Sequence, residues 1–151
     1  MIDVAIRRAQ DSDLPALLRR YAQLDADGGP VLAVDAATAI LRRMATYPDY
    51  AVHVATAADG TLVGTFALLV MDNLAHRGAP SAIVEDVCVA ESLRRRGVGR
   101  AMMRFAMERA RERGCYKLTL SSNVARDQAH AFYLSLGFEQ HGLSFHVRLS
   151  P

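Results

Sequence analysis

The sequence predicts an α/β fold in which one mixed central sheet is covered by helices on both faces. Three observations support this fold class. Segments with an apolar residue at every second position alternate with segments whose apolar residues lie three and four apart. Glycine or proline marks most boundaries between these segments, and no internal repeat or low-complexity segment interrupts them. The predicted order of elements is β-α-α-β-β-β-α-β-α-β-β.

The first half of the chain contributes three predicted strands and two predicted helices. Residues 2–6 alternate between apolar and more polar side chains, which is typical of a half-buried opening strand. Ser12 or Asp11 can cap a first helix, whose apolar face continues to Leu24. The other predicted elements are a helix capped by Asp35 that ends before Pro48, and strands at 50–54 and 62–71 joined by a turn at Asp59-Gly60.

The second half of the chain begins after a predicted loop at 72–81. A central strand at 82–89 is followed by a long helix that starts at Val98 and ends at Gly114. The last predicted elements are a strand at 117–121, a helix at 127–136, and a closing pair of strands at 138–140 and 144–149.

Length and composition indicate an ordinary soluble protein. The chain has 151 residues, of which 51% are hydrophobic and 23% are charged. We therefore expect residues 1–151 to form a single domain. The longest apolar run, Phe66 to Met71, is too short to cross a bilayer, and the N-terminus lacks a secretory pattern, which favours a cytoplasmic location without a membrane partner. Cys88 and Cys115 have neither disulfide nor metal-ligand spacing, so we expect no metal site.

Positive charge is concentrated in the segment 94–113. The whole chain has 18 Lys+Arg against 16 Asp+Glu, a net charge of +2 that does not favour nucleic-acid binding. Eight of the basic and two of the acidic residues lie within this segment, which therefore carries +6 and leaves −4 for the rest of the chain. We expect an anionic ligand to bind there.

The sharpest local pattern is Arg94-Arg95-Arg96-Gly97-Val98-Gly99, between a predicted strand and the start of the long helix. Glycines let the backbone approach a ligand closely, and the first turn of a helix presents amides that suit a phosphate. Arginines add bidentate positive charge. The pattern predicts a pyrophosphate cradle, although it lacks the Gly-Lys-Ser/Thr of a Walker A loop and the third glycine of a dinucleotide fingerprint.

The spacing Arg94-x-x-Gly97-x-Gly99 closely resembles the acetyl-coenzyme A motif of the GNAT superfamily of N-acetyltransferases. The strand before it, 84–89, and the downstream segment 129–138 are also similar to that superfamily. The resemblance covers essentially the whole chain and implies the GNAT fold. It also implies acetyl-CoA as cosubstrate, direct transfer to an amine, and, because related enzymes are often dimers, a homodimer as one arrangement.

Two narrower resemblances concern the acceptor. Glu85-Asp86 with Cys115-Tyr116-Lys117 is similar to the glucosamine-phosphate N-acetyltransferases. The segment 120–124, taken with 132–134 and Glu139-Gln140, is similar to the aminoalkylphosphonate N-acetyltransferases. Both groups acetylate small amines that carry a phosphate or a phosphonate, so the resemblance implies a small anionic amine as acceptor.

The resemblance also implies how the coenzyme is held. The backbone of Val87, Cys88 and Val89 would pair with the pantetheine arm. The pyrophosphate would be held by Arg94, Arg95, Arg96, Gly97, Val98, Gly99 and Arg100. Arg126 stands where the family commonly has an asparagine that contacts the coenzyme, and Asn123 could replace that contact. His130 could contact the coenzyme or tune Tyr133, which lies three residues further along the helix.

Three side chains are candidates for the proton transfers. Tyr133 stands at the family's usual position for the acid that protonates the departing thiolate, and a phenol remains protonated at neutral pH. Without the resemblance, Tyr133 would be read as a core aromatic residue. Glu85 is the first choice for the base and Asp86 the second; a water chain is the alternative to both. Adjacent strand residues face opposite ways, so only one of the two should point into the cleft alongside Val87 and Val89.

Three other functions can be compared with this one from the sequence. Acetylation of a protein N-terminus or lysine would require an open peptide groove. A non-catalytic acyl-CoA sensor is less favoured, because it would not need Tyr133. A nucleic-acid module is the least favoured, because the arginine cluster lacks interleaved aromatic residues.

Overall fold

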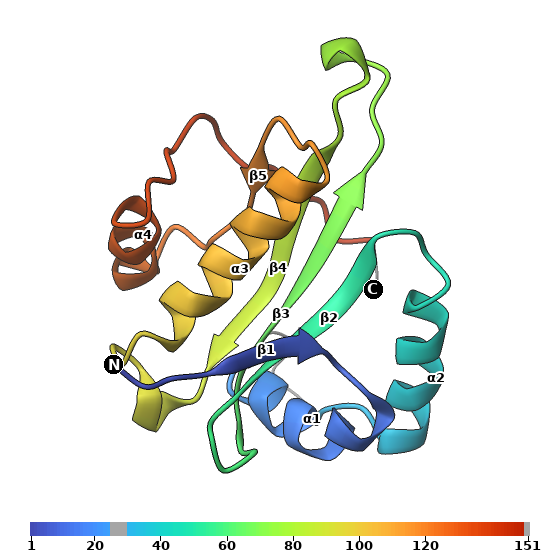
Figure 1. Cartoon of the computed structure of the whole chain (residues 1–151), viewed down its shortest axis with the longest axis vertical. Coiled ribbons are helices and arrows are strands. Elements are labelled where there is room, and N and C mark those ends of the chain that lie inside the picture. The colour runs from blue at the N-terminus through green and yellow to red at the C-terminus, as the bar shows by residue number, and fades with distance from the viewer. Residues whose placement is uncertain (25–29, 150–151) are drawn as a thin grey trace. The chain divides into compact units, whose positions relative to one another are not determined.

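The computed structural model describes residues 1–24 and 30–149 and divides the chain into two units, Met1–Thr119 and Leu120–Pro151 (Figure 1). The first unit contains the sheet and three of the helices. Its elements are β1 (Ala5–Arg8), η1 (Asp11–Asp13), α1 (Leu14–Ala22), α2 (Val34–Met44), β2 (Tyr50–Thr56), β3 (Leu62–Met71), η2 (His76–Gly78), β4 (Ser81–Val89), η3 (Glu91–Leu93), α3 (Val98–Glu112) and β5 (Leu118–Thr119).

The sheet of the first unit is mixed, as predicted. Its strand order is β1-β2-β3-β4-β5, and the first three pairings are antiparallel. The last pairing, between β4 and β5, is parallel and joins only Ala82 to Leu118 and Ile83 to Thr119.

Alternate residues of β2 and β3 form apolar layers on opposite faces of the sheet. One layer belongs to α1 and α2, and its buried members are Leu17, Val52, Val54 and Leu62. The other layer belongs to α3, which crosses β3 and β4 in Figure 1. There the ring of His53 stacks on Phe66 at 5.1 Å and lies 5.2 Å from Phe105. Helices therefore cover both faces, which confirms the predicted fold class.

The start of α3 lies very close to the sheet because β3 has a glycine beneath it. A Cβ atom at Gly64 would lie 2.6 Å from the Met102 sulfur and 3.2 Å from a methyl group of Val98. A larger residue at this position would force these two buried side chains of α3 to shift. Gly64 therefore allows α3 to lie close to β3.

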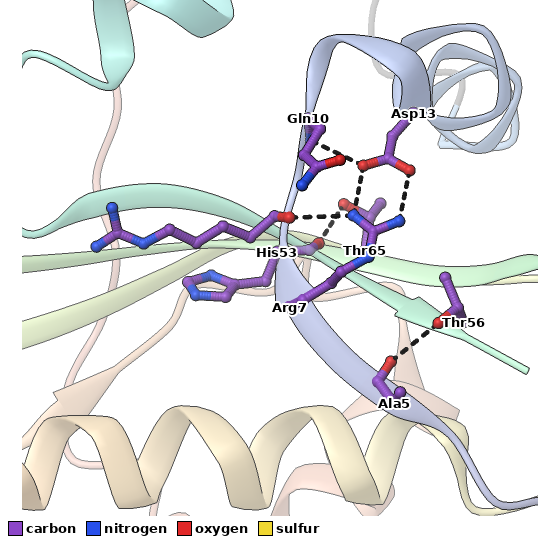
Figure 2. Close-up of polar contacts among 8 residues, drawn as sticks. Ala5, Arg7, Gln10, Asp13, His53, Thr56 and Thr65 are labelled. Carbon is purple, nitrogen blue, oxygen red and sulfur yellow. Dashed lines mark hydrogen bonds and ion pairs between the residues drawn. The ribbon is translucent and has the colours of Figure 1, made fainter. Parts of the chain in front are cut away.

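The start of α1 is fixed by an ion pair rather than by the expected Ser12 or Asp11 cap. Asp13 Oδ2 accepts from the Gln10 amide at 2.7 Å. The same carboxylate binds both terminal nitrogens of Arg7, at 2.6 and 2.8 Å (Figure 2). These contacts join β1 to α1 across the short turn η1.

The second unit contains a single helix, α4 (Asp127–Leu134), among its described residues. The two closing strands expected at 138–140 and 144–149 are not formed in the part of the chain that the structure describes. Their apolar residues do alternate, but Phe145, Val147 and Leu149 are 88%, 76% and 90% exposed. An alternating segment becomes a strand only when another strand pairs with its backbone, and the pattern itself does not supply that partner.

Candidate functional site

The strand β4 has a bulge at the predicted pair of carboxylates. Ala67 of β3 pairs with Glu85, and Thr65 pairs with Cys88, so β4 has one residue more than β3 in this stretch. Asp86 lies within the bulge and has a left-handed backbone with φ 52°. Aspartate is one of the few residues with a side chain that adopts this conformation at small cost.

The bulge changes which face each side chain of β4 occupies. Directly paired residues lie on the same face of a sheet, so Glu85 lies on the face of Thr65 together with Cys88. Strict alternation would place Glu85 on the face of Val87 and Val89. That expectation is wrong, because the extra residue shifts the period of the strand by one.

The two carboxylates at the bulge influence each other. Both side chains are exposed. Partial burial and the negative charge of Asp86 raise the pKa of Glu85 above its ordinary value. A carboxylate with a raised pKa is a better proton acceptor from an ammonium group, so the shift is compatible with the role of base, which stays a prediction for Glu85.

Tyr21 of α1 lies beside the bulge. From the sequence alone, this residue belongs only to the apolar face of the first helix. Its ring packs against the apolar clusters beneath α1 and α2, and its hydroxyl shares a hydrogen bond with Thr65. Thr65 also donates to the His53 carbonyl oxygen at 2.9 Å (Figure 2). Burial raises the pKa of Tyr21 to about 12, and the charge of Asp86 adds to this effect.

One edge of β4 is open beyond its short contact with β5. Pairing with β5 stops at Ile83, whereas pairing with β3 continues to Val89. Over 84–89 this edge has no strand partner within residues 1–24 and 30–149. Unpaired backbone amides and carbonyls suit a ligand that is itself an extended chain with amide groups. The predicted role of Val87, Cys88 and Val89 is compatible with this edge and stays a prediction.

The arginine-glycine turn lies at the start of α3, as predicted. Gly97 caps the helix with φ 92°, a conformation that favours glycine, and the first helical hydrogen bond runs from the Ala101 amide to the Gly97 carbonyl at 3.0 Å. Amides that precede this bond point out of the helix N-terminus, and the macrodipole adds positive charge there. This end of α3 is therefore suited to a phosphate group.

The arginines of the turn are exposed, and one of them already has a partner. Arg94, Arg95 and Arg96 all lie at the surface. Arg94 forms a 3.5 Å ion pair with Glu91, and 57% of the Arg94 side chain is exposed. Exposed pairs of this kind contribute little, so a phosphate could displace Glu91 at small cost.

The N-terminal residues brace the same turn, which the sequence did not indicate. The amide of Ile2 donates to the Arg96 carbonyl at 3.0 Å. A Cβ atom at Gly97 would lie 3.0 Å from the sulfur of Met1. The first two residues of the chain therefore support the predicted cradle, although Ile2 precedes Gly97 by 95 positions. No local pattern in the sequence reveals such a contact.

In the second unit, three of the predicted site residues form one turn before α4. The Asn123 carbonyl accepts from the Arg126 amide at 3.0 Å and from His130 Nε2 at 2.9 Å. The Asn123 side-chain oxygen accepts from the Ala125 amide at 2.9 Å. His130 therefore closes this turn, which gives it a local structural role that the sequence did not predict.

Tyr133 lies on α4 between two phenylalanine rings. The ring centroids are 5.2 Å from Phe132 and 5.7 Å from Phe138. Burial raises the pKa of Tyr133 above its ordinary value, and the positive charge of Arg126 opposes that effect. The phenol is thus protonated at neutral pH, as its predicted role as an acid requires.

The predicted site residues fall into two groups, one in each unit. The first unit carries the carboxylates, the open edge and the arginine turn, which follow one another along the chain from β4 to α3. The second unit carries Asn123, Arg126, His130 and Tyr133 on and before α4. No three His, Cys, Asp or Glu side chains among the described residues are placed to hold a metal ion. Within residues 1–24 and 30–149, every helix is too short or too polar to cross a membrane.

Comparison with known proteins finds related acetyltransferases. The model of the acetyltransferase (GNAT) family matches residues 17–138. The glucosamine 6-phosphate N-acetyltransferase of Trypanosoma brucei brucei is 29% identical over 143 residues, which are 93% of this chain and 92% of that protein. The aminoalkylphosphonate N-acetyltransferase of Salmonella typhimurium is 32% identical over 87 residues, which are 58% of this chain and 56% of that protein.

Solved structures agree with the family match. A protein of Agrobacterium tumefaciens strain C58, provisionally described as an acetyltransferase, is 37% identical and has a TM-score of 0.88. The similarity covers 95% of this chain and 99% of that one.

Proposed function

The chain belongs to the acetyltransferase (GNAT) family, and we propose that it transfers an acetyl group directly from acetyl-CoA to the primary amine of a small molecule that carries a phosphate or phosphonate. The observation that carries this proposal is the bulge of β4. It presents Glu85 and Asp86 next to an open strand edge that leads into the arginine-glycine turn. Relatives that act on glucosamine 6-phosphate and on aminoalkylphosphonates support an anionic amine as the acceptor.

The residues of the first unit fit the coenzyme at two places. The exposed guanidinium groups of 94–96 and the N-terminal amides of α3 suit its pyrophosphate. The open edge of β4 suits the amide groups of its pantetheine arm. When bound, acetyl-CoA supplies a thioester carbonyl carbon as the acceptor of the amine's lone pair.

The amine must lose a proton before it can attack, because an ammonium nitrogen has no lone pair. Glu85 accepts this proton in our account, since its pKa is raised and it lies at the bulge. Asp86 places a second carboxylate nearby, which stabilises the incoming ammonium group. A water molecule could relay the proton between the amine and Glu85.

The departing thiolate needs a proton, which we assign to the Tyr133 hydroxyl. A thiol has a pKa near 8.5 and a phenol near 10, so proton transfer from Tyr133 is only slightly uphill by these ordinary values. The raised pKa keeps the hydroxyl protonated until the thiolate forms. The phenolate is then reprotonated from solvent.

A single assay separates this function from the two alternatives. The protein is incubated with acetyl-CoA and one of five acceptors, and free thiol is followed over time. The acceptors are glucosamine 6-phosphate, glucosamine, 2-aminoethylphosphonate, ethanolamine and a lysine-containing peptide. We expect thiol release with the anionic amines, N-acetylated products by mass spectrometry, and intersecting double-reciprocal plots, which indicate direct transfer.

Other outcomes would contradict the proposal in different ways. Fastest release with the peptide would identify a protein acetyltransferase. Tight binding of acetyl-CoA without release above background for any acceptor would identify an acyl-CoA sensor. Parallel double-reciprocal plots would indicate a covalent acetyl-enzyme and would remove direct transfer.

A further inference from the structure

The last turn of α1 lies against β4 beside the carboxylate bulge. Cys88 Sγ donates to the Arg20 carbonyl oxygen at 3.3 Å and lies 3.9 Å from the Gln23 side-chain oxygen. Tyr21, between these two residues in sequence, is close enough to Asp86 for that carboxylate to affect its hydroxyl. This turn and the bulge therefore border the same part of the sheet surface.

Arg20 is the basic residue of this turn, and its guanidinium group is incompletely satisfied. Nη1 donates to the Gln23 side-chain oxygen at 3.2 Å. Nε is shielded from solvent and has no hydrogen-bond partner among residues 1–24 and 30–149. A shielded N–H of a charged group without an acceptor is costly, so a movement of this side chain that brings Nε to a ligand oxygen would be favourable.

Five arginines of the first unit each form an ion pair with a carboxylate. Arg7 pairs with Asp13 at 2.6 Å, and Arg42 pairs with Asp11 at 2.7 Å. No ion pair joins Arg20 to a carboxylate in the described part of the chain. Its positive charge is thus available to a ligand at the surface that carries Glu85 and Asp86.

We propose that Arg20 binds the anionic group of the acceptor and thereby selects a phosphate- or phosphonate-bearing amine. This inference rests on the proposed function. A guanidinium on α1 and two carboxylates on β4 match a molecule that is positive at its amine and negative at its other end. Arginine binds phosphate and phosphonate oxygens through two parallel hydrogen bonds, which makes Arg20 a specificity-determining residue.

The test compares Arg20→Gln with the matched control Arg19→Gln. Arg19 is the exposed neighbour on the same last turn, so its removal changes the net charge and the helix dipole equally. Each protein is assayed with 2-aminoethylphosphonate and with ethanolamine, which has a hydroxyl in place of the phosphonate. Thermal melting of each variant verifies that it folds, and Arg20→Lys retains the charge without the bidentate geometry.

We expect Arg20→Gln to raise KM for 2-aminoethylphosphonate by about tenfold to a hundredfold, the effect of losing a charge-assisted hydrogen bond. KM for acetyl-CoA and kcat/KM for ethanolamine should change by less than about twofold, and Arg20→Lys should fall between wild type and Arg20→Gln. Arg19→Gln should behave as wild type with both amines.

Equal losses with both amines would overturn the inference and show that Arg20 only supports the local structure. An unchanged KM for 2-aminoethylphosphonate would also overturn it, and so would a selective rise in KM for acetyl-CoA, which would place Arg20 at the coenzyme. If wild type acetylates no amine, the proposed function fails, but calorimetric titration with 2-aminoethylphosphonate still tests Arg20. Weaker binding to Arg20→Gln than to Arg19→Gln would support the inference, and equal binding would refute it.

Discussion

The Tyr133 hydroxyl, in the second unit, is the group that we propose as the proton donor to the departing thiolate. Replacing Tyr133 by Phe keeps the ring that packs against Phe132 and Phe138 and removes only the donor. We expect kcat to fall by about a hundredfold, a typical loss for a general acid. KM for acetyl-CoA should stay within about twofold of wild type in steady-state assays. Tyr47→Phe, at a half-exposed tyrosine of the first unit, is the control, and an unaltered kcat for Tyr133→Phe would remove this hydroxyl from the mechanism.

The raised pKa of Glu85 gives the pH dependence of the reaction a definite sign. Because burial and Asp86 raise this pKa, the acidic limb of kcat/KM should lie above the ordinary glutamate value of 4.5, with activity lost as pH falls through it. Glu85→Gln should lower kcat/KM by about a hundredfold at neutral pH. The loss should shrink at high pH, where the acceptor amine deprotonates unaided.

Two further variants show whether Glu85 is the base. Glu108→Gln changes an exposed glutamate on α3 and should leave the pH profile unchanged. Asp86→Asn should weaken acceptor binding and move the acidic limb to lower pH, because a neighbouring negative charge is lost. A profile for Glu85→Gln that parallels wild type at every pH would assign the proton to a water chain instead.

His53 links the pH to the stability of the fold. Burial, with the positive charge of Arg8 adding, lowers the pKa of His53 to about 4. The unfolded chain has a value near 6.5, so the native state is fully stable above that pH and loses stability as pH falls from 6.5 towards 4. Between pH 7.5 and 5 this one residue should remove about 2 kcal/mol of unfolding free energy.

Urea unfolding at the two pH values measures this contribution. His53→Phe keeps an aromatic ring against Phe66 and cannot take a proton. We expect the variant to lose about 2 kcal/mol less than wild type over the same pH interval. An identical loss in the two proteins would show that His53 accepts a proton in the folded state as readily as in the unfolded state.

Among the elements, the central strand and the long helix were predicted correctly from the apolar period of the sequence. The strand predicted at 82–89 is β4 (Ser81–Val89), and the helix predicted from Val98 is α3 (Val98–Glu112). Gly97, at the end of the predicted cradle, does adopt the positive φ that glycine permits. These features depend on local residue pattern, which a single sequence contains.

The features that the sequence did not predict depend on contacts between distant segments. The bulge of β4 follows from its register with β3, which no periodicity within β4 reveals. The last turn of α1, with Arg20 and Tyr21, contacts β4 although the two segments are far apart in the sequence. Gln23 and Cys88, for example, are separated by 65 positions. The two expected closing strands are not formed within the described residues. Their alternating pattern could not indicate whether another strand would pair with them.

The turn before α3 carries the positive charge that we assign to the pyrophosphate of the coenzyme. Arg94→Ala with Arg96→Ala should raise KM for acetyl-CoA by about tenfold at low salt, because two exposed charges near phosphate are lost. The dependence of this KM on ionic strength should also become weaker. Arg104→Ala, at an exposed arginine within α3, is the control. Wild-type salt dependence in the double variant would show that the pyrophosphate binds elsewhere.

At the scale of the whole molecule, net charge says little and its distribution says much. The chain carries only +2, yet the segment 94–113 carries +6. Ion pairs neutralise part of the positive charge of this segment. Arg109 pairs with Glu112 at 2.8 Å, and Arg113 pairs with Asp49, so the far end of α3 is partly neutralised. Before α3, the exposed guanidinium groups of Arg95 and Arg96 remain for an anionic ligand, and we assign Arg20 as a second positive group near the bulge.

The acceptor that we propose is a small amine with an anionic group. The contribution of that group is measured by kcat/KM for glucosamine 6-phosphate divided by kcat/KM for glucosamine, at saturating acetyl-CoA. The two acceptors differ only in the phosphate, so the ratio isolates its contribution. We expect a ratio of at least about tenfold, the effect of one charge-assisted contact. A ratio of one or below, repeated with 2-aminoethylphosphonate and ethanolamine, would contradict the account.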